Sequence, residues 1–243
     1  MVIQKTAITV TYKRINGIKK AYYDNEESLK VFFNEATVLP VPNDAPAEIP
    51  RIIIKTLNEH AQLNISPIAT TFEIYYDNEF QRNWRLCLNY IIERMTKVFD
   101  FLNTLTNNTY EYIGLITEVI YDEVKEHGTK KIAKNLLNSQ KIKNIHDINI
   151  KYTFIEDKTF FVNIMLQNAR IFKNNFSLNE PGCLQKNVQI NESIGAVIDI
   201  NDRYAFNMHN NYESDSSTLN DLVEHMDNII NNKLELLIEK GEY

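Results

Sequence analysis

Four consecutive residues, Gly128, Thr129, Lys130 and Lys131, are of the types that bind anions where a helix begins. The first N–H groups of a helix have no partner inside the helix, and the helix dipole places partial positive charge at the same end. The wider segment 125–151 adds to this charge, because it carries seven lysines against two acidic residues. The pattern predicts a small anion-binding site, with an ordinary lysine-rich exposed helix as the alternative. Few aromatic residues accompany the lysines, so nucleic-acid binding is not favoured.

The same region contains a second pattern that could do chemistry. Glu123, Val124 and Lys125 match the Glu-x-Lys triplet of restriction-type nucleases, in which two carboxylates hold Mg²⁺ and the lysine assists. The other acid would be Glu111 or Glu118, and neither follows a proline as the motif requires. A metal-dependent nuclease or other phosphoester enzyme that uses residues 118–131 is therefore the alternative function.

The remaining metal-ligating and nucleotide-binding patterns are absent from the sequence. The five histidines form no H-x-H or H-x-x-x-H pair, and the six glycines are isolated, so no phosphate-binding glycine loop exists. Asp221 and His225 are spaced to share a helix face but supply two ligands where catalytic zinc commonly takes three. We interpret them, together with Asp199 and Asp202, as solvated residues. We expect no catalytic residue, no metal and no cofactor.

The elements that must position these residues begin with two long helices. Apolar residues at intervals of four and three predict a helix over 84–105, formed by Trp84, Leu88, Ile91, Met95, Val98, Leu102 and Leu105. A second apolar face predicts a helix over 219–238, with Thr218 and Asp221 as a capping pair. Either helix could bind a partner, but covering the protein's own sheet is the favoured interpretation.

Alternating and turn-bounded apolar segments predict the strands. We expect strands over 6–15, 18–23, 51–56, 62–65, 70–76, 112–121, 147–154, 159–167 and 194–200, with short helices over 26–34 and 129–137. Residues 16 and 17 would form the turn of a hairpin, and the proline-spaced segment 40–50 an extended connector.

The order strand, short helix, hairpin, strand, long helix then occurs twice in the chain. This repetition predicts an α+β fold with two topologically similar halves, residues 1–107 and 108–243, each an antiparallel sheet covered by one long amphipathic helix. No residue identity accompanies the repeat, so it is one of pattern only.

Two resemblances bear on function. The segment Pro42-Asn-Asp-Ala-Pro46-Ala-Glu-Ile-Pro50-Arg51-Ile52 resembles a segment of sporadic uncharacterised bacterial proteins, over about residues 38–105. Antiparallel strands followed by a long helix are similar in order to the export chaperone SecB and its toxin–antitoxin-associated relatives. These resemblances imply a chaperone-like or accessory role and transfer no functional residue.

One predicted strand carries apolar residues on both of its faces. In 159–167, Phe161 and Met165 occupy positions that a sheet covered on one side would give to polar residues. Packing of the two sheets within the monomer would explain this, and an interface with a second copy or a partner is the other explanation. We expect a self-associating or partner-bound, non-enzymatic accessory subunit of a bacterial complex. No apolar run reaches a membrane span and no signal peptide opens the chain, so we expect a cytoplasmic protein that does not bind membranes.

Overall fold

The computed structural model describes residues 1–42, 44–121, 128–137, 144–173 and 188–243. Its strands form one antiparallel sheet in the order β2-β3-β4-β5-β1-β6-β9-β8-β7. The strands are β1 (Val2–Thr11), β2 (Thr37–Val38), β3 (Ile52–Lys55), β4 (Ala61–Ile65), β5 (Ala69–Tyr75), β6 (Tyr112–Tyr121), β7 (Asn149–Glu156), β8 (Phe160–Lys173) and β9 (Val188–Asn201).

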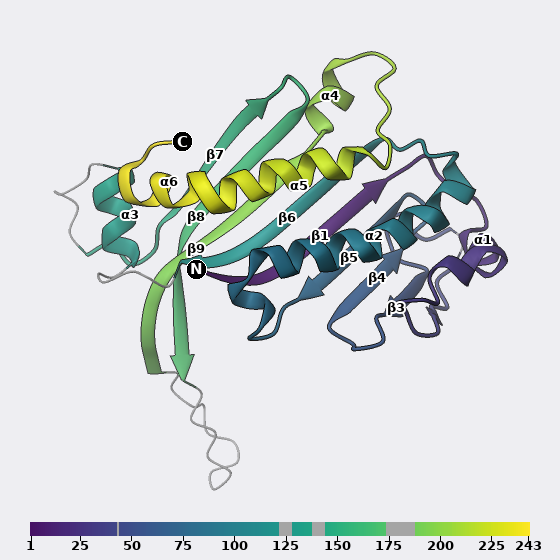
Figure 1. Cartoon of the computed structure of the whole chain (residues 1–243), viewed down its shortest axis with the longest axis horizontal. Helices are drawn as coiled ribbons and strands as arrows, with labels where there is room; N and C mark the ends of the chain where they lie inside the picture. The colour runs from purple at the N-terminus through teal and green to yellow at the C-terminus, as the bar shows by residue number, and fades with distance from the viewer. Residues whose placement is uncertain (43, 122–127, 138–143, 174–187) are drawn as a thin grey trace, which may run out of the picture.

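Long helices cover one face of this sheet (Figure 1). They are α2 (Trp84–Thr106) and, in the C-terminal part, α5 (Thr218–Asn228) and α6 (Leu234–Lys240), joined by a π-helical turn over Ile229–Lys233. The strands alternate in burial because successive side chains point to opposite faces. In β8, for example, Val162, Ile164 and Leu166 are fully buried beneath the helices.

The α+β class and the antiparallel sheet are as the sequence predicts, but the expectation of two separate sheets is wrong. Strand β1 pairs with β6 from Val2↔Ile120 to Thr11↔Tyr112, which joins the strands of both halves into a single sheet. On the helix-covered face of this junction the buried hydroxyls of Thr6 and Thr117 lie 3.3 Å apart and share a hydrogen bond. The boundary between residues 107 and 108 falls in the loop that connects α2 to β6.

The described residues also form the shorter α-helices α1 (Ile18–Asn25), α3 (Gly128–Leu136) and α4 (Arg203–Met208). Helix α1 replaces the strand expected over 18–23. Gly17 adopts a left-handed conformation with φ of 70°, which begins a helix instead of closing a hairpin. Tyr22 then packs edge-on against Phe101 of α2, with the ring centroids 6.0 Å apart.

The prediction of a helix over 26–34 is also wrong, because only a 3₁₀ turn forms there, over Glu26–Ser28.

The α1 and α3 helices lie near opposite ends of the long axis of the molecule in Figure 1. Each follows the first strand of its half, β1 or β6, so the two occupy corresponding places in the chain order.

Candidate functional site

The predicted anion-binding residues do open a helix, α3, and the helix lies very close to strand β9. A Cβ atom at Gly128 would come within 2.3 Å of the Ser193 carbonyl oxygen, so only glycine permits this approach. The approach brings Thr129 beside Glu192. The Thr129 N–H donates to the Glu192 carboxylate at 2.8 Å, and the Thr129 hydroxyl donates to the same oxygen.

The first turn of α3 therefore holds an anion that belongs to the chain itself. A carboxylate satisfies the unpaired N–H groups of a helix N-terminus and interacts favourably with the helix dipole. Lys131 pairs with Glu239 of α6, while Lys130 is exposed. Binding of an external anion at 128–131 stays a prediction, and that anion would have to compete with Glu192.

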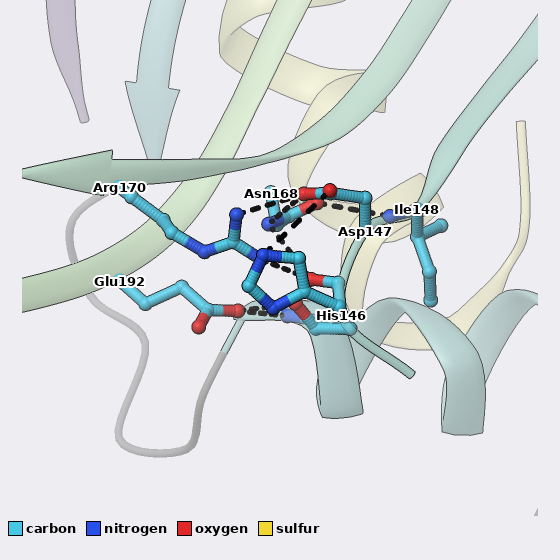
Figure 2. Close-up of polar contacts among 7 residues, drawn as sticks. His146, Asp147, Ile148, Asn168, Arg170 and Glu192 are labelled. Atoms are coloured by element: carbon cyan, nitrogen blue, oxygen red, sulfur yellow. Dashed lines mark hydrogen bonds and ion pairs between the residues drawn. The ribbon is translucent and has the colours of Figure 1, made fainter. Parts of the chain in front are cut away.

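Figure 2 shows the polar contacts next to this helix end. Arg170 of β8 lies opposite Glu192 in the β8–β9 register, and its guanidinium reaches the Asp147 carboxylate at 2.9 Å. Asn168 also donates to Asp147, at 3.3 Å. The hydrogen bond from Asn168, followed by the positive charge of Arg170, lowers the pKa of Asp147. These contacts hold the segment that leads into β7 against β8.

The residues of the alternative enzyme site are only partly described. Glu123, Val124 and Lys125 lie outside the described residues. Glu118 is exposed on β6, on the sheet face away from the long helices, and pairs in register with Lys5 of β1. Glu111 is half-buried and lies before the start of β6. The triplet therefore stays a prediction.

Among the described residues no group of three or more His, Cys, Asp or Glu side chains is placed to hold a metal ion. The described contacts of His225 are with Glu156 and Asp157, not with Asp221: its Nδ1 lies 2.8 Å from the Glu156 carboxylate and its Nε2 lies 3.3 Å from that of Asp157. This contact holds α5 to the turn between β7 and β8.

Asp202 is not the solvated residue that the sequence indicates, because it is fully buried. It accepts hydrogen bonds from the Ile113 N–H at 2.7 Å and the Tyr212 hydroxyl at 2.8 Å. Burial raises the pKa of its carboxyl group, although these hydrogen bonds oppose the shift. The role of Asp202 is to satisfy buried donors at the end of β9.

Phe161 and Met165 lie on the face of the sheet away from the long helices, which we call the open face. Both are half-buried. Phe161 pairs across strands with Ile155, which is 53% exposed, and Met165 pairs with Val197. With Ile116 of β6, 36% exposed, these residues place apolar side chains on all four strands of the C-terminal half. One ring of α4 covers part of this surface, since Tyr204 packs edge-on against Phe161 at 5.3 Å.

On the open face of the C-terminal half a polar row lies between Phe161 and Met165, because Thr153 and Asn163 are hydrogen-bonded at 2.9 Å and Asn163 donates to Asp199 at 3.2 Å. The open face of the N-terminal half carries polar pairs of the same kind. Its cross-strand neighbours are an ion pair between Lys5 and Glu73 at 2.9 Å and a hydrogen bond between the hydroxyls of Thr9 and Thr71 at 3.1 Å. On β4, the side-chain amides of residues 62 and 64 are hydrogen-bonded at 2.7 Å. Polar side chains on this half satisfy one another, as expected for a sheet face in contact with water.

Comparisons with known proteins found no matching family model, no matching curated protein and no matching solved structure. No helix within the described part of the chain has the length and apolar character needed to cross a membrane.

The sequence alone identified Phe161 and Met165 by their place in the alternation of side chains along strand 159–167. It had no signal for Glu192 as the partner of Thr129, because the two residues are separated by 63 positions.

Proposed function

We propose that this protein is a non-enzymatic protein-interaction module, a chaperone-like or accessory subunit that binds another polypeptide chain through the open face of its C-terminal half. The observation that carries the proposal is the apolar set Ile116, Ile155, Phe161, Met165 and Val197 on that face. Exposed apolar surface that spans several strands marks interaction sites more often than isolated apolar residues do.

The single sheet removes the main competing explanation for these residues. If the halves formed two sheets, the apolar open faces could pack against each other within the monomer. Because β1 pairs with β6, the strands of both halves instead lie side by side in one sheet. Helix α4 contacts the open face of the C-terminal half through Tyr204 against Phe161 and Phe206 against Tyr112. A second copy of the chain or a partner would bury the apolar residues that α4 leaves exposed.

We also infer that the chain is a duplicated unit. Strand order supports this inference: reading inward from either end, the neighbours are β2-β3-β4-β5-β1 in one half and β7-β8-β9-β6 in the other, which correspond once the two-residue edge strand β2 is set aside. Each half has its short helix after the first strand and its long helix after the last. The same order of strands and helix motivates the similarity to SecB, and it fits a protein-binding role without assigning a binding residue.

Site-specific crosslinking in the native host tests the proposal directly. A photo-crosslinking amino acid at position 165 should yield adducts heavier than the 28.4 kDa chain, because Met165 lies within the proposed interface. Mass spectrometry of the adduct distinguishes a second copy from a different protein. Light scattering at micromolar concentration then measures self-association of the purified chain.

The matched control places the same amino acid at Gln62, on the polar open face of the N-terminal half. With the crosslinker kept at position 165, F161T should reduce the adduct, and the double substitution F161T/M165T in the unlabelled chain should abolish self-association. Both variants should leave the melting temperature nearly unchanged, since both side chains are only half-buried. Equal crosslinking at positions 62 and 165, or none at either, would contradict the proposal.

A further inference from the structure

A cavity of about 280 Å³ lies beside the start of helix α1, between the end of β1 and the segment that leads into β3. Three cationic residues line it, Arg14, Lys19 and Arg51, together with Gly17 and small apolar surfaces from Ile15 and Pro67. Its lining contains no acidic side chain and no aromatic ring. The open face described above lies on other residues, so this cavity is independent of the proposed function.

Arg51 is the most unusual of these residues because it is a charged side chain that is only 3% exposed. Its Nη1 donates to the Ile49 carbonyl at 2.7 Å, and its Nη2 to the carbonyls of Ala45 and Pro46 at 3.0 and 3.3 Å. Its Nε–H has no acceptor among the described residues, and no described carboxylate lies within ion-pair distance of the guanidinium. A buried charge without a counter-charge is costly.

Lys19 repeats this arrangement on the other side of the cavity. Its ammonium donates to the carbonyls of Leu39 and Val41, at 2.7 and 3.5 Å, and has no described carboxylate partner. The segment from residue 39 to 50 contains four prolines, whose nitrogens cannot donate, so its carbonyls need donors from elsewhere. Lys19 and Arg51 supply them. These hydrogen bonds satisfy carbonyls of the segment, but no described carboxylate balances the positive charge of Lys19 or of Arg51.

The start of α1 adds donors to the same place. Gly17 is the N-cap residue, and no side chain caps the helix. The N–H groups of Ile18 and Lys19 therefore have no acceptor among the described residues, and the helix dipole adds partial positive charge there. Arg14 is exposed and has no described ion pair. Three cations and a helix N-terminus thus surround one cavity without a carboxylate.

We propose that this cavity binds a phosphoryl group, carried on a small non-aromatic molecule. Guanidinium and ammonium groups together with the first N–H groups of a helix are the donors that hold phosphate in proteins. The volume is at the low end of ligand sites, enough for a phosphate with a short carrier. Because no ring lines the cavity, no stacking platform exists for a nucleobase, which separates this site from a nucleotide site.

Isothermal titration of the full chain with inorganic phosphate and with glycerol phosphate, at constant ionic strength, tests the proposal. Both should bind and should raise the melting temperature in a concentration-dependent way, whereas chloride at matched ionic strength should not. R14Q should weaken phosphate binding about tenfold without loss of folding, because Arg14 makes no described contact, and K19Q should weaken it similarly. A nucleoside monophosphate should bind no more tightly than glycerol phosphate.

The matched control is K20Q, which removes a lysine of the same helix that lies outside the cavity. It should leave phosphate affinity unchanged. R51Q is a second variant, in which loss of binding is informative only if circular dichroism shows a native fold. The proposal is overturned if phosphate and chloride stabilise the chain equally, if K20Q and R14Q weaken binding to the same extent, or if neither R14Q nor K19Q changes it.

Discussion

Helices α1 and α3 hold corresponding places in the two halves, yet their N-termini are completed in different ways. At α3, the carboxylate of Glu192 accepts from the Thr129 N–H and hydroxyl. At α1, no side chain caps the helix and the surrounding side chains are cations. The glycines differ too: Gly128 is required by a close approach of two backbones, and Gly17 by a positive φ.

The difference shows that a lysine-rich helix start is not sufficient evidence for an external ligand. What matters is whether the chain already supplies the anion. The segment 128–131 has the stronger sequence pattern, but a strand 63 residues away brings a carboxylate to it. The start of α1 has a weaker sequence pattern, and its cations come from two segments, residues 14–19 and Arg51, and have no described acidic partner.

The largest effect should come from Gly128, with Gly17 as the comparison. G128A should lower the free energy of unfolding by about 3 kcal/mol, because the new Cβ would collide with the Ser193 carbonyl, which is backbone of β9. G17A should cost only about 1 kcal/mol, since nothing lies within 4 Å of its Cβ position and only the left-handed conformation resists alanine. Urea unfolding measures both, and equal losses would remove the distinction between the two helix starts.

Removal of the carboxylate at α3 should have the next largest effect. E192A should destabilise the protein by about 2 kcal/mol, because it deletes the charged acceptor of the Thr129 N–H and hydroxyl. E192Q keeps a neutral acceptor and should lose about half as much stability.

In the background R14Q, E192A should also create phosphate binding at 128–131, measured by titration calorimetry. If no binding appears there, the predicted anion site at α3 is wrong.

The smallest effect should come from giving α1 a carboxylate of its own. N16D places an acidic side chain just before Gly17 and should stabilise the fold by about 0.5 kcal/mol through the helix dipole and the nearby cations. It should also reduce phosphate affinity, because the carboxylate competes for the same donors. N25D, at the other end of α1, is the matched control and should leave phosphate affinity unchanged. Unchanged affinity in N16D would count against the cavity as the phosphate site.

Much of the local structure could be predicted because its signals are local. Strand β6 and the start of α2 at Trp84 follow from periodicity, and the hairpin of β7 and β8 from its turn residues. The wrong prediction of a strand over 18–23 also has a local cause. Apolar residues at 18, 21 and 22 are compatible with either element, and a left-handed Gly17 selects the helix.

The sheet and the sites depend on contacts between distant residues. No local pattern indicates that β1 would pair with β6, or that Glu192 would reach Thr129. The sequence shows the prolines of 40–50. It does not show that Lys19 and Arg51 donate to carbonyls of this segment and of Leu39 beside it. The open-face residues Phe161 and Met165 were accessible to sequence reasoning because alternation within a single strand is sufficient to place them.

The pairing of β1 with β6 also has a consequence for the order of events during synthesis. Strand β1 finds its first partner, β5, within the first 75 residues, but its second edge has no partner until residues 112–121 have been made. A ribosome adds about 5–20 residues per second, so this edge stays open while α2 and the following loop are synthesised. Open strand edges are templates for pairing with other chains. The central strand of the finished sheet is thus an edge strand in the growing chain until β6 is made, and the outer edge of β6 then stays open until β9, residues 188–201, is made.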